Sequence, residues 1–184
     1  MLDASEQLHL AIHASNEGNH HAALSYLKDA LKADPDNAQV LYFLAAEHAE
    51  LGLYERAKTE MEAALKAAPG LDIARFQLGL LCLQLQNTED ASKAFEVIAN
   101  GSSAPDLKLF AAAYLRIIAS DTAEATDLLK SGLEACENKA LRGDMQRVIA
   151  SLSGAPNEPE LGAAQVDESP AVFLGAYRNT EEPS

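Results

Sequence analysis

Three side chains near the start of the chain have the types and spacing of metal ligands. His9, His13 and Glu17 follow one another at four-residue intervals, which places two imidazoles and a carboxylate on one face of a helix. Such a face could bind a metal ion and support a metal-dependent activity. The same spacing is common on solvated helices, and no further ligand is indicated. We therefore expect no metal at these residues.

Other catalytic patterns are missing from the sequence. It contains no glycine-rich phosphate loop, no GxSxG elbow, no HExxH and no pairing of a nucleophilic cysteine with a histidine. Cys82 and Cys136 form no CxxC pair, which disfavours both a zinc knuckle and a disulfide. We expect neither catalysis nor a cofactor, and a reducing cytoplasm as the location.

The overall charge narrows the classes of partner. The 184 residues include 28 acidic and 14 basic ones, for a formal net charge of -14. Nucleic acid and anionic membranes both require clustered positive charge, so neither is an expected partner. No secretion signal is visible at the start, and no apolar run reaches the roughly 18 to 20 residues that span a bilayer. Neutral or basic protein segments are favoured.

The elements that would position any functional residue are set by a repeat of about 34 residues, which is typical of stacked helix pairs. Small residues recur at two offsets, as expected where two antiparallel helices approach most closely. These columns are Ala11, Ala45, Gly79 and Ala113, and Ala23, Ala57, Ala91 and Ala125. A larger side chain fills the space beside them in each unit, namely Leu27, Met61, Phe95 and Leu129. The 48% hydrophobic and 5% aromatic content is typical of Ala- and Leu-rich helices.

Turn residues predict where the helices end. Gly18 and Gly52 end the first helices of their units, Pro35 and Pro69 end the second ones, and Asn87 is predicted to adopt the left-handed conformation in the third turn. The predicted helix pairs span 3–33, 37–68, 71–99 and 106–136. A ninth helix at 138–152 is predicted to cap the array. The domain therefore covers 1–152, with repeats at about 4–37, 38–71, 72–105 and 106–137.

The remaining residues, 153–184, have a different composition. They are rich in proline and acidic residues, and Arg178 is their one base. Such a composition predicts a largely disordered tail. Its exception is an apolar island at 171–177, which is too short to fold alone.

The residues Leu44, Ala45, Gly52, Tyr54, Ala57, Met61, Ala64 and Pro69 form a pattern that resembles the tetratricopeptide repeat. The resemblance covers about residues 4–137 and implies an all-α fold, a right-handed α-solenoid of about four helix-turn-helix units plus a C-terminal capping helix. It also implies that the first helices line a concave groove, which holds a peptide or helix of a partner protein. Members of this family are usually adaptors, scaffolds or chaperones and rarely enzymes.

A second apolar stripe runs along the first helices of the units, at offsets that face the groove in the family. A helix that is apolar on two faces requires cover on both. The stripe defines the predicted partner-binding groove, which consists of Leu8, Ile12, Tyr42, Ile73, Phe76, Leu80, Leu83, Leu107, Phe110, Tyr114 and Ile117.

The sequence allows three alternative ways in which this stripe could be buried. The first is an apolar peptide or amphipathic helix of another protein. The second is the chain's own island, through Val172, Phe173, Leu174 and Tyr177. The third is burial as ordinary core, by neighbouring repeats or by a second copy of the chain in a homodimer.

We therefore expect a cytoplasmic, bacterial, non-enzymatic protein that binds an apolar segment of a partner. The alternatives are an assembly subunit that self-associates or is occupied by its own tail, and a metal-dependent activity at His9 and His13. A group of acidic residues is expected on the wetted outer face, namely Glu47, Glu50, Glu55, Glu60 and Glu62. If some of them rim the groove instead, they would select a partner with basic flanks.

Overall fold

The computed structural model describes residues 2–101 and 103–154, and within these ranges the chain forms nine α-helices and no strand. The outer bounds of the four pairs and of the ninth helix agree with the predicted ones to within one residue, and the helical content confirms the all-α class. The helices are α1 (Ala4–Asn16), α2 (His20–Ala33), α3 (Ala38–Glu50), α4 (Tyr54–Ala67), α5 (Asp72–Gln84), α6 (Thr88–Asn100), α7 (Pro105–Ile118), α8 (Thr122–Ala135) and α9 (Lys139–Leu152). The predicted tail island lies outside the described residues.

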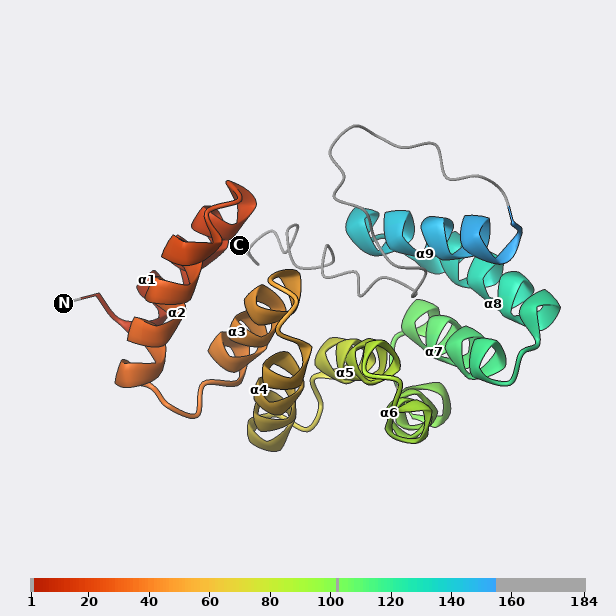
Figure 1. Cartoon of the computed structure of the whole chain (residues 1–184), viewed down its shortest axis with the longest axis horizontal. Coiled ribbons are helices and arrows are strands. Elements are labelled where there is room, and N and C mark those ends of the chain that lie inside the picture. The colour runs from red at the N-terminus through yellow and green to blue at the C-terminus, as the bar shows by residue number, and fades with distance from the viewer. Residues whose placement is uncertain (1, 102, 155–184) are drawn as a thin grey trace.

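The helices are arranged as successive pairs along a curve, as Figure 1 shows. The pair α1 and α2 forms one end, and α9 packs beside α7 and α8 at the other. The first helices α3, α5 and α7 lie on the inner side of the curve, whereas α4 and α6 lie on its outer side. This is an α-solenoid, in which each pair is buried by its neighbours.

The turns within the pairs depend on one residue in the left-handed conformation. Gly18 and Gly52 both have φ of +74°, as predicted. In the third pair the prediction for Asn87 is wrong, because Gln86 has the positive φ, 58°. Asn87 instead caps α6, where its side-chain oxygen accepts a hydrogen bond from the Asp90 backbone N–H at 3.1 Å. The cap supplies a hydrogen-bond acceptor to a backbone N–H group that would otherwise have none. Asn87 therefore serves as the N-cap of α6 rather than as the left-handed residue of the turn.

Paired helices come closest where a ring meets a glycine. A Cβ atom added to Gly79 on α5 would lie 2.6 Å from the Phe95 ring on α6. In the last pair the partners are exchanged, since Gly132 of α8 contacts the Phe110 ring of α7. Both rings are fully buried, so each glycine is required for close packing rather than for its backbone conformation.

An aromatic group joins the third and fourth pairs. The Phe76 ring contacts Phe95 and Tyr114 edge-on, at centroid distances of 5.5 and 5.6 Å. Phe95 and Tyr114 are stacked at 5.1 Å with an interplanar angle of 18°. These three rings connect α5, α6 and α7, and favourable aromatic geometry adds to the free energy gained from their burial.

Replacing Gly132 with alanine tests the ring contact. We expect G132A to lower the free energy of unfolding by about 1 to 3 kcal/mol, because the new methyl group would clash with the Phe110 ring. The matched control is G143A within α9, where the nearest atom to an added Cβ is a terminal nitrogen of Arg147 at 3.9 Å. There we expect a gain of up to about 1 kcal/mol from helix propensity. Urea unfolding of the two variants measures both effects, and equal stabilities would contradict the packing described for Gly132.

Candidate protein-binding face

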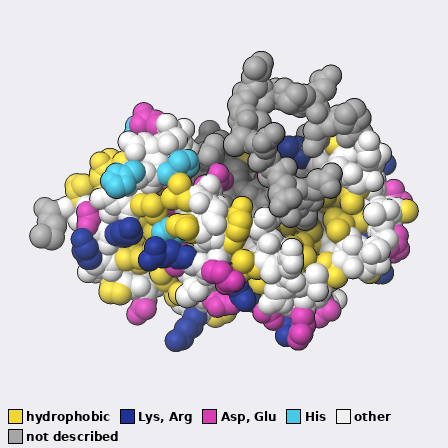
Figure 2. Space-filling view, in the orientation of Figure 1, with side chains coloured by type: hydrophobic (Ala, Val, Ile, Leu, Met, Phe, Trp, Pro, Cys, Tyr) yellow, Lys and Arg dark blue, Asp and Glu magenta, His cyan; other side chains and the backbone are white. Residues whose placement is uncertain are grey.

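The predicted groove residues divide into two groups in the structure. Four of them are half-buried on the first helices, namely Ile12, Ile73, Leu83 and Ile117. The other seven are buried, namely Leu8, Tyr42, Phe76, Leu80, Leu107, Phe110 and Tyr114. Figure 2 shows hydrophobic side chains gathered over α5, α7 and α8 along the inner side of the curve. We call the four half-buried side chains the aliphatic stripe.

Three of the buried rings do not form an open surface. Phe76 and Phe110 are 0% exposed and Tyr114 is 1% exposed. The Phe76 and Tyr114 rings pack on Phe95 of the outer helix α6, and Phe110 packs on α8 at Gly132. The expectation of a ring-lined groove is corrected accordingly: in this conformation these rings fill the space between helices.

The inner side also contains a buried acidic side chain, Asp144 of α9. Asp144 is 2% exposed, and its Oδ1 atom accepts a hydrogen bond from Arg147. Its Oδ2 atom and the Tyr114 hydroxyl are both buried, and neither has a hydrogen-bond partner among the described residues. Two unsatisfied polar atoms at one place are costly in a core.

Burial shifts the protonation of these groups. Burial raises the pKa of Asp144 to about 6; the nearby Arg147 opposes this shift, and the charge of Glu50 adds to it. Burial, with a contribution from Asp144, also raises the pKa of Tyr114, so its hydroxyl stays protonated.

Glu47 is buried rather than wetted, so that prediction is wrong. Its carboxylate accepts a hydrogen bond from the Ser15 hydroxyl of α1, and Oε2 lies 2.8 Å from Nδ1 of His20. Glu47 therefore holds the first pair of helices against the second. A signal was present in the sequence, since Leu81 has the same offset one repeat later and is also buried. His48 is similarly buried, and its Nδ1 lies 2.5 Å from Glu60 Oε2.

The predicted metal-ligand residues lie on the exposed side of α1. His13 Nε2 and Glu17 Oε1 are 3.4 Å apart, and their side chains are 72% and 64% exposed. In the part of the chain that the structure describes, no group of three or more His, Cys, Asp or Glu side chains is placed to hold a metal ion. None of the helices there combines the length and apolar character that a membrane crossing requires.

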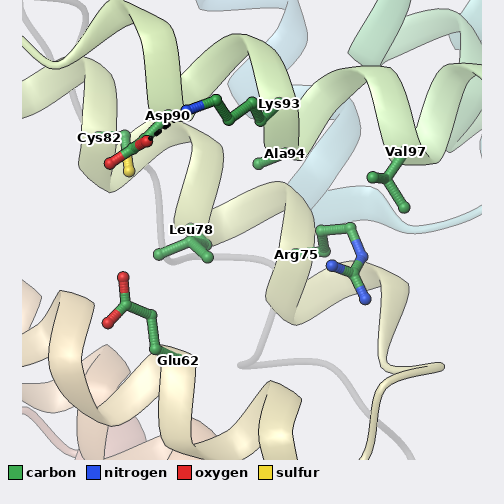
Figure 3. A pocket seen from close by; sticks show the side chains of 8 residues that line it. All are labelled: Glu62, Arg75, Leu78, Cys82, Asp90, Lys93, Ala94 and Val97. Carbon is green, nitrogen blue, oxygen red and sulfur yellow. Dashed lines mark hydrogen bonds and ion pairs between the residues drawn. The ribbon is translucent and has the colours of Figure 1, made fainter.

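An open pocket of about 300 Å³ lies between α4, α5 and α6 (Figure 3). Its charged side chains are engaged with each other, since Lys93 bonds to Asp90 at 3.3 Å and Lys58 also reaches Asp90 at 3.4 Å. Cys82 faces this pocket but is buried, and burial raises the pKa of its thiol to about 11. A thiol of this kind is a poor nucleophile at neutral pH.

The sequence profile of the tetratricopeptide repeat matches residues 16–77, which include the turns at Gly18 and Gly52. This match falls on the helix pairs and the repeat spacing described above. Residues 16–77 thus belong to the tetratricopeptide-repeat family, and the same helix-pair fold continues through the later pairs. Folds of this family serve in general as protein-interaction modules. No curated protein is significantly similar to it in sequence.

Solved structures with the same fold come from several bacteria. A tetratricopeptide-repeat protein from Parabacteroides merdae has a TM-score of 0.63 at 21% identity, over 82% of this chain and 59% of its own. PilF of Pseudomonas aeruginosa has a TM-score of 0.62 at 21% identity, over 83% and 69%. MamA from Desulfovibrio magneticus RS-1 has a TM-score of 0.59 at 17% identity, over 82% and 89%. At these identities the structural likeness shows a shared fold alone. The chain spans 59% of the length of the Parabacteroides protein.

Asp144 gives the stability of the folded chain a testable pH dependence. Its pKa is higher in the folded chain than in the unfolded one, so protonation stabilises the fold, and this stability is lost as the pH rises through about 6. We expect D144N to raise the free energy of unfolding by about 1 to 2 kcal/mol near pH 7. The difference from wild type should shrink toward pH 5, where Asp144 is itself protonated.

Urea unfolding at several pH values measures this difference. The matched control is D127N on the exposed side of α8, where we expect no effect at any pH. A destabilised D144N variant at pH 7, or a difference that does not change with pH, would contradict the role given to burial.

Proposed function

We propose that this protein is a non-enzymatic adaptor, scaffold or chaperone that binds an apolar peptide or amphipathic helix of another protein along its inner face. The observation that carries the proposal is the aliphatic stripe. Helices α5 and α7 already bury one apolar face within the array, yet Ile73, Leu83 and Ile117 remain half-buried. Apolar side chains on a second face of a helix are typical of helix-in-groove recognition.

The charge distribution supports a partner with basic flanks. The net charge of the chain is -14, and Figure 2 shows Asp and Glu side chains over α4 and α6 on the outer edge. Glu50 is exposed at the end of α3, next to the inner side. Such a surface accelerates encounters with positively charged segments.

A cytoplasmic location is part of the same proposal. Cys82 and Cys136 are both buried and both free thiols. Free cysteines are usual in a reducing compartment. Bacterial origin and a homodimer remain predictions.

The test uses two charged substitutions on the aliphatic stripe. We expect I73E combined with I117E to reduce partner binding at least tenfold, because each covered aliphatic side chain contributes about 1.5 to 3 kcal/mol. The control is V97E on the outer helix α6, where Val97 is 53% exposed and no role is assigned. Affinity purification from the native cell, followed by a binding titration with the captured protein, gives the measurement.

Circular dichroism first establishes that the variants keep their helical content. A captured protein that binds wild type, V97E and the double variant equally well would show that the inner face is not the binding surface. A partner bound only by wild type and V97E supports the proposal. Light scattering of the purified protein separates a second copy of the chain from a different partner.

A further inference from the structure

The chain continues for thirty residues beyond the last described one, Gly154, and one stretch of them differs in charge from the rest. Residues 169–180 contain no acidic residue and include Arg178, the one base of the tail. The apolar residues Val172, Phe173, Leu174 and Tyr177 precede Arg178 directly. In a chain of net charge -14, this stretch is therefore apolar with a positive end.

The inner face offers the complementary surface. Ile73 and Leu83 of α5 and Ile117 of α7 present half-buried aliphatic side chains. The inner helices also carry negative charge, since Glu50 is exposed at the C-terminal end of α3. The inner helices thus offer half-buried aliphatic side chains and an exposed acidic residue, which complement the apolar residues and the base of the tail stretch.

We propose that residues 171–178 bind in cis to the inner face, with the Phe173 and Tyr177 rings on the aliphatic stripe and Arg178 beside Glu50. The segment is then the first occupant of this face in the free protein. This goes beyond the proposed function, since cis binding requires no partner.

The length of the connection allows this contact. Residues 155–170, 16 in all, separate Gly154 from Ala171, and such a segment extends to about 50 Å when fully stretched. As a flexible chain it has an average end-to-end distance of roughly 20 to 25 Å. A tether of this length gives an effective concentration in the millimolar range, so even a weak site on the same molecule is mostly occupied. A second copy has no such advantage at micromolar concentration.

Isoleucine methyl signals of the full-length protein test the proposal. In the variant F173S with Y177S, we expect the δ1-methyl resonances of Ile73 and Ile117 to move, because they lose ring contacts. The resonance of Ile98, which is buried in α6, should not move. The matched control is L161S, which removes an apolar side chain from the same tail outside the island and should leave all three resonances in place.

A synthetic peptide of residues 169–180 completes the test. Added to the double variant, it should return the Ile73 and Ile117 resonances toward their wild-type positions. A peptide carrying R178Q should bind two- to fivefold more weakly, as expected for an exposed ion pair. The E50Q substitution in the protein should weaken the unmodified peptide by the same factor.

The outcomes are distinct. Unchanged Ile73 and Ile117 resonances in the double variant would overturn the proposal, as would a peptide that moves neither. Resonances that shift with protein concentration would identify a second copy as the occupant and overturn binding in cis. Partner binding is measured separately, with the variant that combines I73E and I117E. The proposed function can therefore fail while binding in cis holds, and binding in cis can fail while the proposed function holds.

Discussion

The contact between a large side chain and a small residue on the facing helix is the constraint on which the rest of the structure depends. In the third pair Phe95 of the outer helix packs on Gly79 of the inner one, and in the fourth pair Phe110 of the inner helix packs on Gly132 of the outer one. One repeat after Phe95, the same position is occupied by the smaller Leu129. The helix that supplies the ring is thus exchanged between the two pairs, and in each pair a glycine on the facing helix makes room for the ring.

This exchange determines what the inner face can offer to a partner. Because Phe110 packs on α8 and Phe76 joins Phe95 and Tyr114, the rings that might have lined the curve stabilise the array instead. The side chains left at the surface are aliphatic and half-buried. An aliphatic stripe selects its ligand by shape and apolar area rather than by aromatic stacking. In the binding mode proposed above, exposed acidic residues such as Glu50 would add specificity for a segment with basic flanks.

The helices and their order could be predicted from the sequence because small residues and turn residues repeat with the same spacing. The role of Gln86 could not, because Asn is the usual left-handed residue and its capping of α6 competes with that use. The burial of Glu47 was missed because its partners, Ser15 and His20, lie 32 and 27 residues away. The orientation of Phe76 and Phe110 was missed for a related reason. Helical spacing places residues on one face of a helix, but it does not say whether superhelical packing covers that face.

Asp144 breaks the repeat in a way that stability alone does not explain. The same offset holds Leu8, Tyr42, Phe76 and Phe110 in the four units, so four buried hydrophobic side chains are followed by one buried carboxyl group. An apolar residue there would avoid the unsatisfied Oδ2 atom, and it would relieve the charge interaction with Glu50. Local departures of this kind concentrate where a protein performs its function. Together with the Tyr114 hydroxyl, Asp144 places two buried polar groups without hydrogen-bond partners among the described residues in an otherwise apolar core. Burial of such groups lowers the stability of the fold, so the residue at this position is not the one that packing alone would favour.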